Sequence, residues 1–440
     1  MTMRLVHFDE ARASAVEAMK AIFADGGMAR AVIVDDLFGR VRVVVWAAAS
    51  ADEAALRARI DDKLREACAQ YWTGDLWFVG PATLPEDTLF YDKAWEEGVA
   101  VVSSDRLRLN DRHRTRTAWF LPIEKSRAAW SATEGPPILV FHSFKGGVGR
   151  TTALAAYAIA LARRGERVAV IDFDLDAPGV GRLLDADGQG TTARWGVVDF
   201  LLESRDDLPL TDYLHTCARE NVTGAGTIEV FPAGALDDAY LTKLARIDVE
   251  VGTDPSRHPL LRLCHRIRAE RRPSVILVDG RAGLSPAAGL LLSGFAHMHV
   301  LFATTNPQSL GGLERVIRHL GFAQARRGLS QSECVIVQAM VPDSTEVGTA
   351  AAADFASKVE DIFLAGYYAK EADDEDRLWS LDDLSSSVAP HVPVTISYRG
   401  KLSFFHTIDQ IADLLVFEPD YVKLRARLDE RVMLTPSEGV

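Results

Sequence analysis

The pattern of apolar and polar positions divides the chain into two regions of different character. In the first region, apolar residues recur at helical spacing over residues 15–23 and 51–69. Short β-rich runs lie at residues 31–34, 41–46, 76–79 and 99–102. The first two of these runs flank a turn-prone hexapeptide and predict a hairpin. This mixture predicts a smaller α+β domain.

The second region repeats a different pattern, in which apolar strand-like runs alternate with helical stretches. The runs lie at residues 137–141, 167–171, 228–231, 274–278, 298–303, 334–337 and 392–396. Helical spacing separates most of them, as at residues 152–163. Strands that alternate with helices indicate βαβ units, so we expect an α/β fold with a mainly parallel, doubly wound sheet. Residues 371–376 and 385–387 indicate an irregular insertion before the last strand.

Tryptophan marks the change from one region to the other. Six of the eight tryptophans precede residue 131: Trp46, Trp72, Trp77, Trp95, Trp119 and Trp130. The next residues, Ser-Ala-Thr-Glu-Gly-Pro-Pro, form a turn-prone connector. We therefore expect one domain at residues 1–134 and a second at residues 135–440.

Composition excludes several classes of protein. Of the 440 residues, 49 are Lys or Arg and 62 are Asp or Glu, which gives a formal charge of −13. That balance disfavours a nucleic-acid coat or attraction to anionic membrane. The sequence has no long apolar span and no apolar signal core near its start. The four cysteines (Cys68, Cys217, Cys264 and Cys334) lack metal-ligand spacing, which favours a reducing cytoplasm.

Two polar features of the first region have competing interpretations. Residues 106–116 contain five arginines, followed by Trp119, and this basic segment is compatible with binding to nucleic acid or to a phosphorylated partner. A solvated surface is the favoured interpretation, because charge runs usually face water. Asp35 and Asp36 form a carboxylate pair, but aspartates at a hairpin turn are more often turn formers.

The run Phe-Lys-Gly-Gly-Val-Gly-Arg-Thr-Thr at residues 144–152 carries the clearest chemistry. It follows a strand-like run and opens a predicted helix, as a phosphate-binding loop does. Glycines let successive N–H groups approach phosphate oxygens, and the helix N-terminus adds partial positive charge. We expect the phosphates of a nucleotide to bind Gly146, Gly147, Val148, Gly149, Arg150, Thr151 and Thr152. Within this set, the Thr151 hydroxyl is expected to bind Mg²⁺ and Thr152 to reach the α-phosphate.

Two positions of the loop depart from the general P-loop pattern. Arg150 stands directly before Thr151, where lysine is usual, and Lys145 lies near the start of the loop. In this early lysine the loop resembles the deviant P-loop of the ParA/MinD family of ATPases. The resemblance implies that Lys145 acts catalytically, by reaching the phosphates of the partner subunit in an ATP-bridged homodimer. Guanidinium is larger than ammonium and planar, so we expect Arg150 to neutralise the phosphates while slowing hydrolysis.

Three further segments resemble the same family. The run Val-Ile-Asp-Phe-Asp resembles its first switch, which implies that Asp174 positions the attacking water and that Asp172 supports the metal. The apolar run that ends at Asp279 resembles a Walker B strand, whose carboxylate holds Mg²⁺ through water. Gly283 stands where a backbone N–H senses the γ-phosphate. Gln338 takes the place at which the family commonly has an asparagine that reads adenine.

The resemblance implies an ATP- and Mg²⁺-dependent dimerisation switch with slow ATP hydrolysis. The acidic chain, and the mixed charges of residues 421–433, favour a protein partner over a membrane anchor or DNA. We expect residues 1–134 to recognise that partner. Two alternatives stay open: a non-hydrolysing ATP-binding scaffold, and a partition-type DNA-binding ATPase that uses residues 106–116. Arg281 replaces a family proline and either contacts phosphate or pairs with a surface acid.

Overall fold

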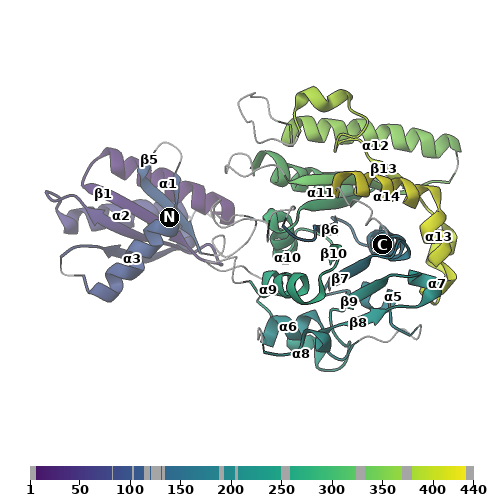
Figure 1. Cartoon of the computed structure of the whole chain (residues 1–440). Helices are drawn as coiled ribbons and strands as arrows, with labels where there is room; N and C mark the ends of the chain where they lie inside the picture. The colour runs from purple at the N-terminus through teal and green to yellow at the C-terminus, as the bar shows by residue number, and fades with distance from the viewer. Residues whose placement is uncertain are drawn as a thin grey trace. The chain divides into compact units, whose positions relative to one another are not determined.

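The chain forms two compact units, Met1–Phe120 and Leu121–Val440, in a computed structural model (Figure 1). The structure describes residues 6–81, 83–101, 104–112, 119, 130, 134–187, 193–203, 207–248, 258–323, 332–343, 345–368 and 379–432. Two earlier features, the acidic residues 371–376 and the two arginines Arg114 and Arg116, lie outside the described residues.

The first unit is built on a mixed five-stranded sheet with the strand order β3-β2-β1-β5-β4. Its strands are β1 (Met28–Asp35), β2 (Val41–Ala47), β3 (Trp72–Phe78), β4 (Val99–Val101) and β5 (Ser104–Asp111). Its helices are α1 (Phe8–Ala24), α2 (Glu53–Cys68) and α3 (Pro85–Glu97). The predicted hairpin is present as the antiparallel pair β1–β2, while β5 pairs parallel to β1. The expected α+β domain is confirmed.

Alternation along β1 explains how the sheet is covered on both faces. Ile33 joins a core that includes residues of α1 and α2, whereas Val32 and Val34 lie in a second cluster with Ala94 of α3. Successive side chains of a strand point to opposite faces, so the apolar residues 31–34 of β1 pack against helices on both sides.

The basic segment of the first unit is engaged in internal contacts. Arg106 of β5 donates from Nε to the carbonyl oxygen of Ala29 at 2.8 Å. Arg108 donates to the carbonyl oxygen of Trp95 at 3.0 Å, and its guanidinium lies 4.5 Å from the centre of that indole ring. At the hairpin, Asp36 accepts backbone N–H groups of the turn, as a turn former does.

The second unit is built on an eight-stranded sheet with the order β13-β12-β11-β6-β10-β7-β9-β8. Its strands are β6 (Ile138–Ser143), β7 (Arg167–Phe173), β8 (His215–Cys217), β9 (Thr227–Phe231), β10 (Val275–Gly280), β11 (Met298–Ala303), β12 (Glu333–Val341) and β13 (Val394–Ser397). All neighbouring pairs are parallel except β8–β9. The mainly parallel, doubly wound sheet is therefore confirmed, with β8 as an added antiparallel edge.

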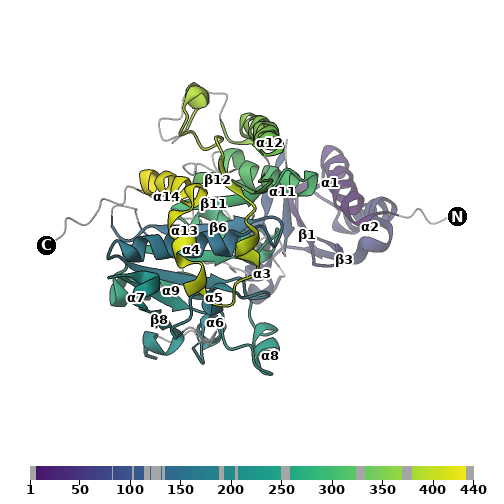
Figure 2. The ribbon, with the colours of Figure 1, turned by 90° about the vertical axis from the view of Figure 1, so that its right-hand side faces the viewer.

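Helices connect these strands and cover the sheet (Figures 1 and 2). They are α4 (Arg150–Arg163), α5 (Val180–Leu183), α6 (Val197–Glu203), α7 (Glu220–Thr223), α8 (Tyr240–Leu244), α9 (Pro259–Arg266), α10 (Pro286–Leu290), α11 (Pro307–Arg318), α12 (Thr345–Gly366), α13 (Ala412–Phe417) and α14 (Pro419–Val432). The alanine-rich α4 is buried along most of its length, and residues of α13 and α14 share its core. Because α4 is anchored in this way, its N-terminus is held firmly beside the end of β6.

The division between the units lies ahead of the boundary near residue 134 that the sequence suggested. Trp130 belongs to the second unit, where its indole nitrogen donates to the carbonyl oxygen of Pro136 at 2.9 Å. His297 Nε2 lies 2.8 Å from the carbonyl oxygen of Trp130, and Arg268 lies over the indole ring. Trp130, the last of the six tryptophans that mark the first region of the sequence, therefore packs on the second unit.

The cysteines and the helix lengths add two observations. All four cysteines are buried free thiols. In the part of the chain that the structure describes, no helix combines the length and the apolar character needed to cross a bilayer.

Candidate functional site

The glycine-rich loop joins β6 to α4 and has a conformation that depends on glycine. Gly147 and Gly149 have φ angles of 74° and 82°, a left-handed region that residues with a Cβ atom rarely adopt. A Cβ atom added to either of them would meet no other atom within 4 Å, so the loop faces open space. Glycine is thus required by the backbone conformation, which leaves an open cradle of N–H groups suited to phosphate.

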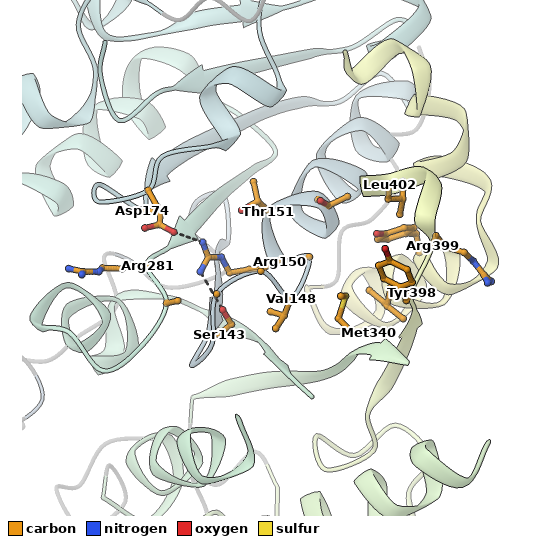
Figure 3. Close-up of a pocket in the computed structure, with 18 of the residues that line it drawn as sticks. Ser143, Val148, Arg150, Thr151, Asp174, Arg281, Met340, Tyr398, Arg399 and Leu402 are labelled. Atoms are coloured by element: carbon orange, nitrogen blue, oxygen red, sulfur yellow. Dashed lines mark hydrogen bonds and ion pairs between the residues drawn. The ribbon is translucent and has the colours of Figure 1, made fainter. Parts of the chain in front are cut away.

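A cavity of about 670 Å³ lies over this loop, a volume that suits a nucleotide. At one end its walls include Asp174, Asp176 and Arg281. At the other end they come from the ends of β12 and β13 and the segment after β13 (Figure 3). The loop residues Gly146, Gly147, Val148, Gly149, Arg150, Thr151 and Thr152 line the middle. The structure therefore brings the whole predicted phosphate-binding set to one cavity.

Arg150 is the centre of a buried polar cluster at the phosphate end. Its Nε donates to Asp279 Oδ1 at 2.7 Å and its Nη2 to Asp174 Oδ2 at 2.8 Å. Its Nη1 lies 3.4 Å from the Ser143 hydroxyl oxygen (Figure 3). Burial alone would lower the pKa of Arg150, but the two carboxylates outweigh burial and raise it. One guanidinium thus joins the first switch to the Walker B strand, a bridge that lysine, with a single ammonium, does not reproduce.

One further carboxylate, that of Asp172, lies beside Asp279 at the ends of neighbouring strands. Asp172 of β7 pairs in register with Asp279 of β10, and both are almost fully buried. Burial, followed by the nearby Asp279 carboxylate, raises the pKa of Asp172 to about 8. Burial also raises the pKa of Asp279, against the opposing effect of Arg150. Buried carboxylates that disfavour each other's charge form a site that a cation relieves.

The donor set of this cluster suits Mg²⁺. The Thr151 hydroxyl lies 2.7 Å from Asp279 Oδ2, at the first turn of α4. Asp172 accepts N–H groups from Gly179 and Gly181 on Oδ2, while its Oδ1 has no hydrogen-bond partner among the described residues. A hydroxyl and carboxylate oxygens are the ligands that Mg²⁺ prefers. Thr151, Asp172 and Asp279, which the sequence suggested as metal residues, therefore lie together.

Comparison with known proteins now identifies the domain. Residues 139–337 match the family model described as the CobQ/CobB/MinD/ParA nucleotide binding domain. Within the second unit, these residues are thus similar to a nucleotide-binding domain of this family. No curated protein matches the chain.

Several solved structures are similar to this chain. The ParA protein of pNOB8, bound to nonspecific DNA, is 14% identical with a TM-score of 0.46, over 68% of this chain and 99% of that chain. MinD of Aquifex aeolicus is 18% identical with a TM-score of 0.42, over 69% and 98%. MinD of Pyrococcus horikoshii OT3, complexed with Mg-ADP, is 21% identical with a TM-score of 0.34, over 48% and 72%.

Three loop residues of the second unit have informative surroundings. Lys145 is exposed at the start of the loop. The N–H group of Gly283 donates to the carbonyl oxygen of Ser143 at 3.0 Å, so in this structure it is engaged within the protein. Arg281 pairs with Asp176 at 2.6 Å, and both side chains are about two-fifths exposed. Because Arg281 also lines the cavity, both roles left open for it by the sequence stay open.

The structure does not bring Gln338 to the cavity. Its side chain is buried in β12, where the amide nitrogen donates to the carbonyl oxygen of Ala351 at 3.0 Å. The amide oxygen lies 3.4 Å from the Thr395 hydroxyl, on the neighbouring strand. Met340, two residues further along, lines the cavity instead. Sequence reasoning missed Met340 and the residues that follow β13, because no motif marks them.

Proposed function

We propose that this chain is an ATP- and Mg²⁺-dependent dimerisation switch that hydrolyses ATP slowly and acts on a protein partner. The arrangement of Arg150 carries the proposal, because its guanidinium holds Asp174 and Asp279 together beside an open phosphate loop. A charged group in this position holds the first switch to the Walker B strand in the absence of phosphate. Nucleotide phosphates, being strongly anionic, compete with both carboxylates for the same guanidinium.

The proposed roles follow from chemical type and position. Thr151, Asp172 and Asp279 hold Mg²⁺, which when bound neutralises charge on the phosphates. Asp174 orients the attacking water at the phosphate end of the cavity. Lys145, exposed at the start of the loop, reaches across to the phosphates of a second copy.

Slow turnover is the expected consequence of the bridge. Asp174 Oδ2 accepts from Arg150, so that oxygen becomes available to water only after the guanidinium turns toward phosphate. Phosphoryl transfer depends on positioning and charge stabilisation. Molecules in the bridged state do not position the attacking water, so the share of molecules in that state lowers the rate of hydrolysis.

A protein partner is supported by charge. The chain carries a formal charge of −13, and two arginines of the basic segment, Arg106 and Arg108, are engaged with backbone carbonyl oxygens and aromatic rings. Such arginines are poorly placed to neutralise DNA phosphates. We propose that the first domain, residues 1–134 in the sequence-based division, contacts the partner. DNA binding that weakens steeply with salt, and is lost when these arginines are neutralised, would support the partition-type alternative instead.

Light scattering on the full chain with ATP, ADP or no nucleotide tests the dimerisation switch. We expect the mass to double with Mg²⁺ and ATP, and the Lys145→Ala variant to remain monomeric. Lys423→Ala is the matched control, because Lys423 is an exposed lysine on α14 of the same unit. A wild-type mass that ATP does not change, or equal behaviour of the two variants, would contradict the proposal.

Phosphate release distinguishes the switch from the non-hydrolysing scaffold. The Asp174→Asn variant keeps the shape of the side chain but loses its charge. We expect slow release in the wild type and at least a tenfold lower rate in the variant, in the range for a lost positioning group. No Asp174-dependent release, together with intact ATP-driven assembly, would favour the scaffold.

A further inference from the structure

The end of the cavity away from Asp174 has an apolar and aromatic lining. Its walls include Met340 of β12, Ile396 of β13, and Tyr398 and Leu402 from the segment that follows β13. Met340 and Tyr398 lie close to each other across from Val148 of the phosphate loop (Figure 3). Since the loop takes the phosphates, this end is the place for the nucleoside.

An unusual backbone conformation places Met340 at this end. Its φ angle is 60°, in the left-handed region that is rare for residues other than glycine. The pairing of β12 with β13 is interrupted between Gln338 and Val341, and the N–H group of Tyr398 donates to the carbonyl oxygen of Val341 at 2.8 Å. Met340 is 44% exposed, as is Tyr398. Strain of this kind persists where surrounding structure enforces it, and it is concentrated at ligand sites.

Two polar groups near this end, the Gln338 side-chain amide and the Ser397 N–H group, have partners within the protein. The Gln338 amide bonds to Ala351 and Thr395. The N–H group of Ser397 donates to Asp420 Oδ2 at 2.9 Å.

Arg399 is likewise held by carboxylates of its surroundings. Its Nη2 donates to Glu418 Oε1 at 2.8 Å, and its Nη1 contacts Asp343. The guanidinium points away from Met340 and Val148 (Figure 3). Hydrogen bonds from these groups to a base edge would require existing bonds to break.

We propose that the base is held by stacking and apolar contact with Met340 and Tyr398, and that the site therefore accepts ATP and GTP with similar affinity. The inference rests on the proposed nucleotide site and specifies its substrate class. Every base has a π-face, so aromatic stacking tolerates different bases. Apolar pockets discriminate between similar ligands by about 10- to 200-fold at most, whereas pockets that hydrogen-bond a ligand group reject analogues by about 10⁴-fold or more.

Calorimetric titration of the full chain with Mg²⁺ and ATP, GTP or inorganic triphosphate tests this proposal. We expect the ATP and GTP dissociation constants to agree within about tenfold, as for a pocket without base-edge hydrogen bonds. A preference of more than about 100-fold for either nucleotide would overturn the proposal. Absence of binding by all three ligands would instead refute the nucleotide site itself, so the two failures are distinguishable.

The Met340→Gly variant tests the contact without endangering the fold. Glycine accepts the φ angle of 60° more readily than methionine does, so we expect the unfolding temperature to be maintained or raised. Loss of the thioether should weaken ATP and GTP alike by about tenfold, while affinity for inorganic triphosphate stays constant. The matched control is Ala69→Gly, at a residue of the first unit with a φ angle of 47°, which should leave all three affinities constant. Unchanged nucleotide affinity in Met340→Gly, or loss of only one nucleotide, would overturn the proposal.

Discussion

The bridge formed by Arg150 predicts a measurable loss of stability in the Arg150→Lys variant. The guanidinium donates at 2.7 Å to Asp279 and at 2.8 Å to Asp174, whose side chains are 1% and 12% exposed. The two carboxylates bond different nitrogens of the guanidinium, and lysine has one nitrogen on a shorter side chain, so we expect it to keep only one of the two bonds at this geometry. The variant therefore loses at least one charge-assisted hydrogen bond in a buried site, which contributes about 2 kcal/mol.

Calorimetric melting of the full chain without nucleotide is the appropriate assay, because the two units need not unfold together. For a unit of roughly 300 residues, a loss of about 2 kcal/mol lowers the melting temperature by about 3 °C. We expect this shift in the transition that responds to nucleotide, since that transition belongs to the second unit. The transition of the first unit should not move.

The matched control for this variant is Arg164→Lys. Arg164, at the end of α4, donates to both oxygens of Asp429 at 2.8 and 3.2 Å, but its side chain is 45% exposed. Exposed pairs contribute about 0–1 kcal/mol, so its transition should move by less than about 1.5 °C. If Arg150→Lys shifts the transition no more than Arg164→Lys does, the bridge does not stabilise the nucleotide-free state and our account of slow turnover fails.

Three further predictions concern packing, titration and surface charge in the second unit. Gly312→Ala would place a Cβ atom 1.9 Å from Phe144 Cγ, so we expect the melting temperature of the second unit to fall by several degrees. In the control Gly311→Ala the added Cβ atom has nothing within 4 Å, so this variant should raise stability by up to about 1 kcal/mol. Equal melting shifts for the two variants would contradict this packing. Burial lowers the pKa of His299 to about 3, so its neutral form contributes stability above pH 6.5 that is lost as the pH falls toward 3. Between pH 7 and pH 5 the wild type should lose about 2 kcal/mol more than His299→Leu, measured as the difference between their melting shifts. Arg281→Gln breaks the ion pair with Asp176, in which the side chains are 42% and 43% exposed, so we expect the melting temperature to fall by less than about 2 °C. A larger fall would show that this pair contributes more stability than exposed ion pairs do.

The strands of the second unit were predictable because of where they lie. In β10, all six residues from Val275 to Gly280 are buried, and a strand covered on both faces appears in the sequence as an uninterrupted apolar run. The edge strand β8 has three residues, His215–Cys217, of which only Cys217 is buried. Such a short strand produces no alternation that a sequence pattern can detect.

For the tryptophans and arginines near the first unit, the sequence did not predict which residues they contact. Six tryptophans appeared to mark one domain, but Trp130 packs in the second unit through Pro136 and His297. The run of arginines suggested a surface charge, and Arg106 is indeed exposed, but the sequence did not reveal that Arg106 and Arg108 also donate to carbonyl oxygens of β1 and α3 residues. Composition gives only the number of residues of each type, whereas the burial of one residue depends on which helices and strands pack around it.

The sequence by itself determined the phosphate loop, its place between a strand and a helix, and the carboxylates that end β7 and β10. These features are local, because glycine spacing and apolar runs act on the backbone of their own segment. Only the tertiary structure decided the partners of Arg150, one of which, Asp279, lies 129 residues away in the chain. The same holds for Gln338, which faces Ala351, and for Met340, which faces the cavity. Strand order and register bring such distant side chains together, and neither is encoded in the spacing of any single motif.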